Sequence, residues 1–304
     1  MKVFNSIAEA AGKIQNAVVT TGSFDGVHIG HKIIIDRLNQ IARDIGGESV
    51  LVTFYPHPRK VLYPEQKDLK LINSQKEKEG LLRKAGLDNL IVIPFSLEFS
   101  KTSSHDFVKW ILIRQLQARV VVIGHNHHFG HNRQGDYSYL HALGQELDFR
   151  VEEIPLKDIE NETVSSTKIR KALKEGNIQR ANAYLDHQYI IAGQLEVNQA
   201  ALAVPGFPTI GIRIEEEEKL IPPPGIYATN LLIGSDWKKS MSLVMDTGNG
   251  IARVETHPLY ETPELEGKTA TLYFYKKVAE GISGEHWRAG LLEQAREMVE
   301  ELIY

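Results

Sequence analysis

The chain has 304 residues, of which 42% are hydrophobic and 24% charged, and its formal net charge is −4. This length allows substantial cores in about two domains, and the absence of cysteine excludes disulfides and thiolate metal sites. The acidic balance argues against a nucleic-acid partner, and no apolar run forms a signal-peptide core or approaches the roughly 18 residues of a membrane span, so we expect a cytoplasmic protein without a membrane partner.

The first predicted strand leads into a glycine-punctuated loop and then a helix. Apolar residues 17–19 precede the loop TTGSFDGVHIGH at 20–31, and the helix that follows has a regular apolar face. His28 and His31 project from one side of the helix N-terminus, where unpaired N–H groups and the helix dipole favour anions. Either histidine alone would be an ordinary polar surface residue. Together, with Gly30 between them, they predict a polyphosphate site.

Strands and helices alternate from residue 1 to about 186, which predicts a parallel α/β domain. After residue 187 short strand candidates separated by turns predict a small antiparallel barrel, closed by a helix at about 284–303 with one apolar stripe. We therefore expect two domains, 1–186 and 187–304. The acidic run 215–218 is predicted to be a solvated hairpin tip. The further strands expected are 49–54, 90–94, 119–124, 149–154, 190–195, 209–214, 226–233, 241–246 and 269–275. The apolar stripe consists of Trp287, Leu291, Ala295, Met298 and Leu302.

Three clusters of polar and aromatic residues in the first domain each lie beyond the carboxyl end of a predicted strand. Open α/β sheets place their ligands at this edge. Residues 54–59 (FYPHPR) suit a flat aromatic ligand held by stacking, although a proline-rich connector fits equally well. Residues 124–136 are rich in histidine, but without a clearly spaced carboxylate they do not favour a metal site. Asn126, an amide, and Arg133, a forked donor, are the better candidates for binding a ligand. Residues 165–170 (SSTKIR) open a helix as a cap and also gather anion-binding groups.

A phosphate site of this kind suits nucleotidyl transfer without a catalytic triad. A phosphate monoester nucleophile has a second pKa near 6 and is mostly dianionic at neutral pH, so it needs no general base. The site must then position the reactants and neutralise the phosphate oxygens with imidazoles, N–H groups, cationic side chains and a metal ion.

Four segments of the first domain together resemble a known family. The chain looks like the prokaryotic bifunctional FAD synthetases, which join an FMN adenylyltransferase of the HxGH nucleotidyltransferase fold to a riboflavin kinase barrel. The resemblance covers nearly the whole first domain in the family's order. The segments that carry it are 22–31 (GSFDGVHIGH), 53–58 (TFYPHP), 129–135 (FGHNRQG) and 165–170 (SSTKIR).

The resemblance implies roles for individual residues. His28 and His31 contact the ATP phosphates, and catalytic Thr167 and Arg170 close over them. The other residues implied at the ATP site are Gly22, Phe24, Asp25, Gly30, Arg133 and Ser166. The flavin pocket is implied to consist of Phe54, Pro56, His57, Pro58 and Asn126. We therefore expect FAD and pyrophosphate to be made from ATP and FMN with Mg²⁺, and nothing in the pattern indicates an oligomeric state.

Three alternatives share parts of this signal. Class I aminoacyl-tRNA synthetases also carry His-Ile-Gly-His, but residues 238–242 (KKSMS) imitate their lysine loop by composition only. Related adenylyltransferases for pantetheine phosphate or nicotinate mononucleotide lack the proline-rich aromatic loop. A non-catalytic flavin or nucleotide sensor would not need the intact His28, His31, Thr167 and Arg170.

The second domain resembles riboflavin kinase at 206–209, 222–228 and 254–257, where Glu255 matches the catalytic base and Thr209 a magnesium ligand. It departs from the family at an apolar loop, 200–205, at Gly211 in place of an asparagine, and at 242–253, which lacks the family's Asn-Gly-Arg-Pro-Thr segment. We expect much or all of the riboflavin kinase activity to be lost, because phosphoryl transfer depends on positioning and charge neutralisation. The alternative is a complete bifunctional enzyme that also phosphorylates riboflavin to FMN.

Overall fold

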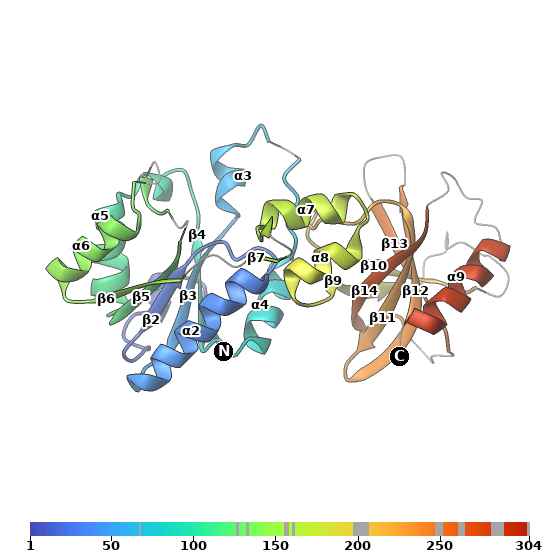
Figure 1. Ribbon diagram of the computed structural model, residues 1–304, viewed down its shortest axis with the longest axis horizontal. Coiled ribbons are helices and arrows are strands. Elements are labelled where there is room, and N and C mark those ends of the chain that lie inside the picture. Colours follow the sequence, from blue (N-terminus) through green and yellow to red (C-terminus); the bar gives the residue numbers. More distant parts are fainter. Residues whose placement is uncertain are drawn as a thin grey trace. The chain divides into compact units, whose positions relative to one another are not determined.

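A computed structural model describes residues 1–66, 68–125, 128–131, 134–154, 158–159, 162–196, 207–246, 252–260, 265–280 and 289–302. The chain divides into two compact units (Figure 1). Unit 1 is Met1–Leu69 with Lys78–Val164, and unit 2 is Lys70–Glu77 with Ser165–Tyr304. The predicted order, a parallel α/β part followed by an antiparallel barrel and a C-terminal helix, is confirmed.

Unit 1 is built on a six-stranded parallel sheet. Its strands are β1 (Lys2–Phe4), β2 (Val18–Thr21), β3 (Ser49–Tyr55), β4 (Asn89–Pro94), β5 (Val120–Gly124) and β6 (Arg150–Ile154), in the order β1-β4-β3-β2-β5-β6. Val18 of β2 lies opposite Ser49 of β3 on one side and Val120 of β5 on the other. The chain continues from β2 to β3 and β4 in one direction, whereas β5 and β6 extend the sheet the other way. The sheet therefore has a topological switch point between β2 and β5.

Helices cover both faces of this sheet because its strands are apolar on both sides. Val18 and the alternate residues of its neighbours pack against α2 (Ile29–Asp44) and α4 (Gln75–Lys84). Val19 faces the opposite way and packs with α1 (Ile7–Ala10), η2 (Phe107–Gln115, a π-helix) and α6 (Tyr137–Leu147). Shorter elements of the unit are α3 (Pro58–Leu62), η1 (Phe99–Lys101), α5 (Ser104–Asp106), β7 (Asp158–Ile159) and β8 (Glu162–Thr163).

Unit 2 is a closed antiparallel barrel in the order β10-β13-β12-β11-β14-β9. Its strands are β9 (Tyr189–Glu196), β10 (Ile210–Arg213), β11 (Gly225–Ile233), β12 (Asp236–Asp246), β13 (Ala252–Pro258) and β14 (Thr269–Glu280). Tyr189, Tyr227 and Phe274 are among its largest fully buried side chains. The sequence did not predict β13, because Glu255 and His257 give the segment a polar character although both are buried.

Two further helices, α7 (Ser166–Lys174) and α8 (Ile178–Leu185), belong to unit 2. The side chain of Asn182 on α8 donates a hydrogen bond to Phe274 O (2.8 Å) and accepts one from Tyr189 N (2.7 Å). These bonds join α8 to β14 and β9, so the compact unit begins before residue 187. The boundary between functional domains at 186/187 stays a prediction.

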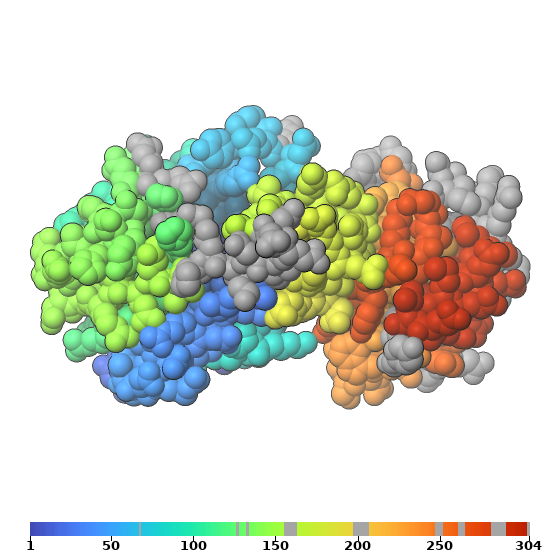
Figure 2. Space-filling view, viewed as in Figure 1, coloured from blue at the N-terminus to red at the C-terminus, as the bar shows by residue number. Residues whose placement is uncertain are grey.

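The C-terminal helix α9 (Ala289–Leu302) packs on the outside of the barrel (Figure 2, red). Its buried residues are Leu292, Ala295 and Val299, which contact a cluster that includes Ile226 and Met241. The predicted apolar stripe is wrong in register: Met298 and Leu302 are 39% and 38% exposed, and Trp287 lies outside the described residues. The predicted stripe and the buried one share Ala295. The barrel packs against Leu292 and Val299, each one residue after a member of the predicted stripe. None of the helices described in the structure is long and apolar enough to cross a membrane.

Candidate nucleotide-binding site

The loop between β2 and α2 lies beside the topological switch point, where open sheets bind ligands. His28 is the N-cap residue of α2, with an extended backbone, and its side chain makes no capping hydrogen bond. The first N–H groups of this 16-residue helix therefore have no side-chain cap from their N-cap residue. The geometry supports the sequence-based prediction of an anion site at this helix terminus.

Three aromatic rings are stacked at this terminus. The ring of His31 lies between those of His28 and Phe24, at centroid distances of 3.6 and 4.3 Å. Phe24 has a φ of 47°, a left-handed conformation that bulky residues rarely adopt. This backbone conformation brings the Phe24 ring against His31 and is the kind of local strain that clusters at binding sites.

Gly22 and Gly30 leave room for these rings. A Cβ atom at Gly22 would lie 3.1 Å from the Phe24 ring, and one at Gly30 would lie 3.2 Å from the His28 ring. Both contacts are tighter than ordinary van der Waals separations. The two glycines thus have a packing role in the loop besides any contact with ATP.

His31 is neutral at pH 7. Burial lowers its pKa well below 6.5, and the nearby His28 and Lys78 lower it further. Its Nδ1 atom is buried and has no hydrogen-bond partner among the described residues. A neutral imidazole offers one N–H donor, so His31 can offer an anion a hydrogen bond but not the positive charge of a protonated histidine.

This pKa shift predicts a pH-dependent stability. Because His31 binds a proton in the unfolded chain near pH 6.5 but only at lower pH in the folded chain, the unfolded state binds more protons in between. The contribution of His31 to the free energy of unfolding is constant above pH 6.5. Between the pKa of His31 in the unfolded chain and its lower pKa in the folded chain, this contribution declines on acidification by about 1.4 kcal/mol for each pH unit. We expect His31→Gln to reduce the fall in unfolding free energy between pH 8 and 5.5, measured by urea denaturation.

The matched control for this measurement is His128→Gln, which replaces an exposed histidine of the same unit. His257 in unit 2 also has a pKa lowered chiefly by burial. Some loss of unfolding free energy on acidification therefore remains in every variant. An unchanged pH dependence in His31→Gln would contradict the assignment of a depressed pKa to His31.

Sequence reasoning missed a buried cation beside these rings. Lys78 on α4 is only 8% exposed, and its Nζ lies 3.4 Å from both Ser23 O and Thr53 Oγ1. Thr53 is fully buried in β3, so the ammonium group lies between the phosphate loop and the sheet. The lysine stands in a helix rich in charged residues, and no sequence spacing distinguishes it from a solvated one.

The proline-rich segment after β3 is only partly available to a ligand. The half-buried Phe54 ring lies 5.6 to 6.4 Å from those of Phe95, Phe99 and Phe107. His57 caps α3 by accepting a hydrogen bond from Arg59 N through its Nδ1 (3.2 Å). The remaining predicted residues of this segment are the exposed Pro56 and the half-buried Pro58.

Two other predicted residues of unit 1, Asn126 and Arg133, lie outside the described residues. Of the histidines in the same loop, His125 contacts Glu153 Oε1 through Nδ1 (2.9 Å), and His131 Nδ1 lies 3.1 Å from Ser100 O. Asp25 in the phosphate loop is 4% exposed. Among the described residues no three histidine or acidic side chains come together as a metal site.

The predicted anion clamp lies at the start of α7 in unit 2. Ser165 caps this helix by accepting a hydrogen bond from Lys168 N (3.4 Å). The half-buried Ser166 and the exposed Thr167 begin the first turn, and Arg170 follows on the next turn. Its closure over phosphates bound by His28 and His31 stays a prediction.

The predicted kinase residues lie together in the barrel. Glu255 is fully buried in β13, accepts a hydrogen bond from Thr209 Oγ1 at Oε2 (2.6 Å) and pairs with Arg253 at Oε1. Gly211 of β10 lies opposite Glu255 and provides no side-chain oxygen. The apolar loop 200–205 is outside the described residues. Within the described part, Glu255 is held by a hydroxyl and a guanidinium group rather than presented alone to a substrate.

A parallel sheet with a histidine-bearing helix N-terminus at its switch point, followed by a closed barrel, fits a two-part protein of the nucleotidyltransferase class. The FAD synthetase family model matches residues 11–168, and the riboflavin kinase model matches residues 185–299. The chain belongs to the family of bifunctional riboflavin kinase/FMN adenylyltransferases.

Curated relatives match most of the chain. The bifunctional riboflavin kinase/FMN adenylyltransferase of Pseudomonas fluorescens is 30% identical over 88% of this chain and 86% of its own length. The protein of the same description from Listeria monocytogenes is 32% identical over 75% of this chain and 72% of its own. A crystal structure described as a macrolide-efflux protein from Streptococcus pneumoniae superposes with a TM-score of 0.84 at 24% identity, covering 98% and 97% of the two chains. At that identity the superposition shows a shared fold.

Proposed function

We propose that the chain is an FMN adenylyltransferase that transfers AMP from ATP to FMN, giving FAD and pyrophosphate. The observation that carries the proposal is the stacked pair His28 and His31 at the N-terminus of α2, within the segment matched by the FAD synthetase model. The relatives are described as bifunctional riboflavin kinase/FMN adenylyltransferases, which supports the same substrates.

In this reaction a phosphate oxygen of FMN bonds to the α-phosphorus of ATP, and the bond from that phosphorus to the oxygen bridging the β-phosphate breaks. The FMN phosphate is mostly dianionic at pH 7 and needs no general base. His28, His31 and the α2 N–H groups donate hydrogen bonds to the ATP phosphates, and Lys78 supplies positive charge. Ser166, Thr167, Arg170 and Arg133 complete the phosphate site, while Gly22, Phe24, Asp25 and Gly30 shape its loop.

Magnesium is proposed to enter with ATP. Mg²⁺ characteristically keeps several waters and binds through one or two carboxylates together with substrate phosphates. The ion would neutralise charge on the phosphates while the side chains of the chain position them.

The direct test incubates the full chain with FMN, ATP and Mg²⁺ and follows FAD by chromatography, with pyrophosphate measured in parallel. We expect equal amounts of both products. Pantetheine phosphate and nicotinate mononucleotide serve as alternative acceptors and should give no adenylylated product. No FAD above a protein-free control would overturn the proposal and favour a non-catalytic flavin or nucleotide sensor.

We propose that the flavin pocket includes Phe54, Pro56, His57, Pro58 and Asn126. Replacing Phe54 with alanine should weaken FMN binding by about 1–3 kcal/mol if the ring stacks on the flavin, measured as KM for FMN and by calorimetry. Because Phe54 also packs against other phenylalanines, the protein should lose some stability as well. Phe99→Ala is the control: it disturbs the same cluster and should leave the KM for FMN nearly unchanged. A normal KM in Phe54→Ala would contradict the pocket assignment.

The riboflavin kinase match at 185–299 favours a second candidate function, phosphorylation of riboflavin to FMN. We propose that this activity is strongly reduced or lost. Glu255, the predicted base, is already engaged in an ion pair with Arg253 and a hydrogen bond from Thr209. Gly211 has no side-chain oxygen that could bind a magnesium ion together with Thr209.

We therefore expect riboflavin, ATP and Mg²⁺ to give little FMN with the wild-type chain, and Glu255→Gln to change that rate little. The measurement is chromatographic detection of FMN and FAD, since any FMN formed can be adenylylated further. Robust turnover that collapses in Glu255→Gln would instead establish a complete bifunctional enzyme.

A further inference from the structure

One short segment joins the barrel although the chain on either side of it belongs to unit 1. This segment, Lys70–Glu77, is part of unit 2. Leu71 forms a parallel bridge with Lys219: Leu71 N donates to Glu218 O and Leu220 N donates to Leu71 O, both at 2.7 Å. Main-chain hydrogen bonds therefore hold the segment to residues 218–220, which connect β10 to β11 of the barrel.

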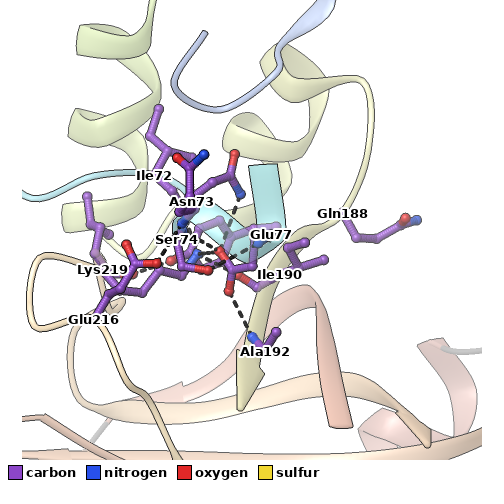
Figure 3. Close-up of polar contacts among 12 residues, drawn as sticks. Ile72, Asn73, Ser74, Glu77, Gln188, Ile190, Ala192, Glu216 and Lys219 are labelled. Carbon is purple, nitrogen blue, oxygen red and sulfur yellow. Dashed lines mark hydrogen bonds and ion pairs between the residues drawn. The ribbon is translucent and has the colours of Figure 1, made fainter. Parts of the chain in front are cut away.

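The last residues of the segment form the start of α4, and a capping box caps this helix N-terminus. Ser74 Oγ accepts from Glu77 N (3.2 Å), and Glu77 Oε2 accepts from Ser74 N (2.9 Å). The other carboxylate oxygen, Oε1, accepts from Ala192 N of β9 at 2.8 Å (Figure 3). Glu77 thus fixes the helix start and attaches it to a barrel strand.

Lys219 completes this attachment. Its Nζ lies 2.6 Å from Glu77 Oε2, 2.6 Å from Ile72 O and 2.7 Å from Ile190 O, so all three ammonium protons have an acceptor (Figure 3). The ammonium also lies 4.4 Å from the centroid of the Tyr189 ring. Both side chains of the pair are at most 1% exposed. The three ammonium protons of Lys219 and both carboxylate oxygens of Glu77 thus have hydrogen-bond partners, and a buried network of this kind holds the two side chains in one arrangement.

The next residue along the chain is Lys78, the buried cation beside His31, and it belongs to unit 1. One peptide bond therefore joins the anchored Glu77 to the lysine proposed to contact the ATP phosphates. Both residues lie near the start of α4, and because they are neighbours on one helical backbone, a displacement of one alters the placement of the other.

We propose that Glu77 and Lys219 are positioning residues for adenylyl transfer, which hold the start of α4 so that Lys78 Nζ stays between Ser23 O and Thr53 Oγ1. This inference rests on the proposed function and assigns the barrel a part in it. The barrel then contributes to FAD synthesis through Lys219, independently of whether Glu255 phosphorylates riboflavin. Misplacement of a charged group by about 1 Å from a distant change can lower a rate by about 10²-fold.

The test is a double-mutant cycle on the full chain with FMN, ATP and Mg²⁺. Lys78→Met should lower kcat for FAD formation by about 10²-fold, as loss of one preorganised donor does, and Lys219→Met by about 10-fold or more. If Lys219 acts through Lys78, adding Lys219→Met to Lys78→Met should cause no further loss in kcat. Independent, multiplicative losses would overturn the proposal and leave a merely structural role.

The matched control is Lys76→Met. Lys76 lies in the same helical turn and pairs with Glu215 (2.7 Å), but its side chain is 77% exposed. This variant should retain the wild-type kcat. If Lys219→Met does not fold, Glu77→Gln takes its place in the cycle, because it removes the negative charge that pairs with Lys219 while keeping the size of the side chain. A kcat loss in Lys76→Met equal to that in Lys219→Met would also contradict the proposal.

A second readout does not depend on activity. The charge of Lys78 helps to lower the pKa of His31, so NMR titration of labelled histidine reports whether the ammonium is in place. We expect the His31 pKa to rise in Lys78→Met and in Lys219→Met but not in Lys76→Met. An unchanged His31 pKa in Lys219→Met, with a rise in Lys78→Met, would overturn the positioning role. Absence of FAD with the wild-type chain would refute the proposed function instead, and this titration would still decide whether Lys219 holds Lys78 in place.

Discussion

Replacing His31 with alanine should lower kcat for FAD formation by about 10²-fold or more. His31 offers one N–H donor from a neutral ring that is fixed between His28 and Phe24, and a preorganised donor of this kind costs nothing to orient as charge develops on the phosphates. Loss of one such donor typically reduces kcat by 10²–10³-fold. The measurement is steady-state FAD formation by the purified full chain at saturating ATP and FMN.

The split between kinetic constants separates this role from simple binding. An interaction made mainly in the transition state lowers kcat and kcat/KM together, whereas uniform binding raises KM alone. We expect the first pattern for His31→Ala. The control is His128→Ala, at an exposed position of the same unit. A His31→Ala enzyme with normal kcat and raised KM for ATP would limit His31 to ground-state binding of ATP.

The sequence predicts most of unit 1 because its signals are local and strong. Buried parallel strands are nearly continuous apolar runs, and β3, β4 and β5 follow that pattern. The edge strand β6 contains an arginine and two glutamates and departs from it. β1 is only three residues long, too short for any periodicity. In unit 2 the sequence does not predict β13, because Glu255 and Thr256, on opposite faces of the strand, are polar although both are fully buried.

The candidate site is predictable where it depends on a junction between elements. A strand, a glycine-containing loop and a helix start locate His28 and His31 without any knowledge of the rest of the chain. The packing of Phe24 on His31 was not predictable, since it requires a left-handed backbone at a phenylalanine. Phe54 was assigned only to the ligand, yet its ring also belongs to the aromatic cluster of unit 1.

The attachment of the 70–77 segment to the barrel was not predicted. Its members Glu77 and Lys219 are 142 residues apart, and no local pattern connects them. The capping-box spacing of Ser74 and Glu77 was the one available signal, and it indicates a helix start rather than a buried ion pair. The acidic run 215–218 is likewise not a freely solvated tip: Glu215 pairs with Lys76, and Glu216 Oε1 accepts a hydrogen bond from Gln75 N (2.7 Å).

Breaking the buried pair should destabilise unit 2 more than any other single polar change considered above. Removing one partner of a buried ion pair leaves an uncompensated charge and typically costs about 3–5 kcal/mol. We expect a loss of that size for Lys219→Met, which would leave Glu77 charged among buried groups, and a similar loss for Glu77→Leu. Lys76→Met removes an exposed pair and should change stability by less than about 1 kcal/mol.

The double variant Glu77→Leu, Lys219→Met decides whether charge or packing is responsible. It removes both charges of the pair, so its loss in unfolding free energy should be clearly smaller than the sum of the single losses. Some loss should remain, because the N–H groups of Ser74 and Ala192 have given up their acceptor. Since two units need not unfold together, the free energies should be read from amide hydrogen exchange in β9 and β14. Losses that simply add in the double variant would mean that the two side chains stabilise the barrel independently, and the pair would then not act as one anchor for the start of α4.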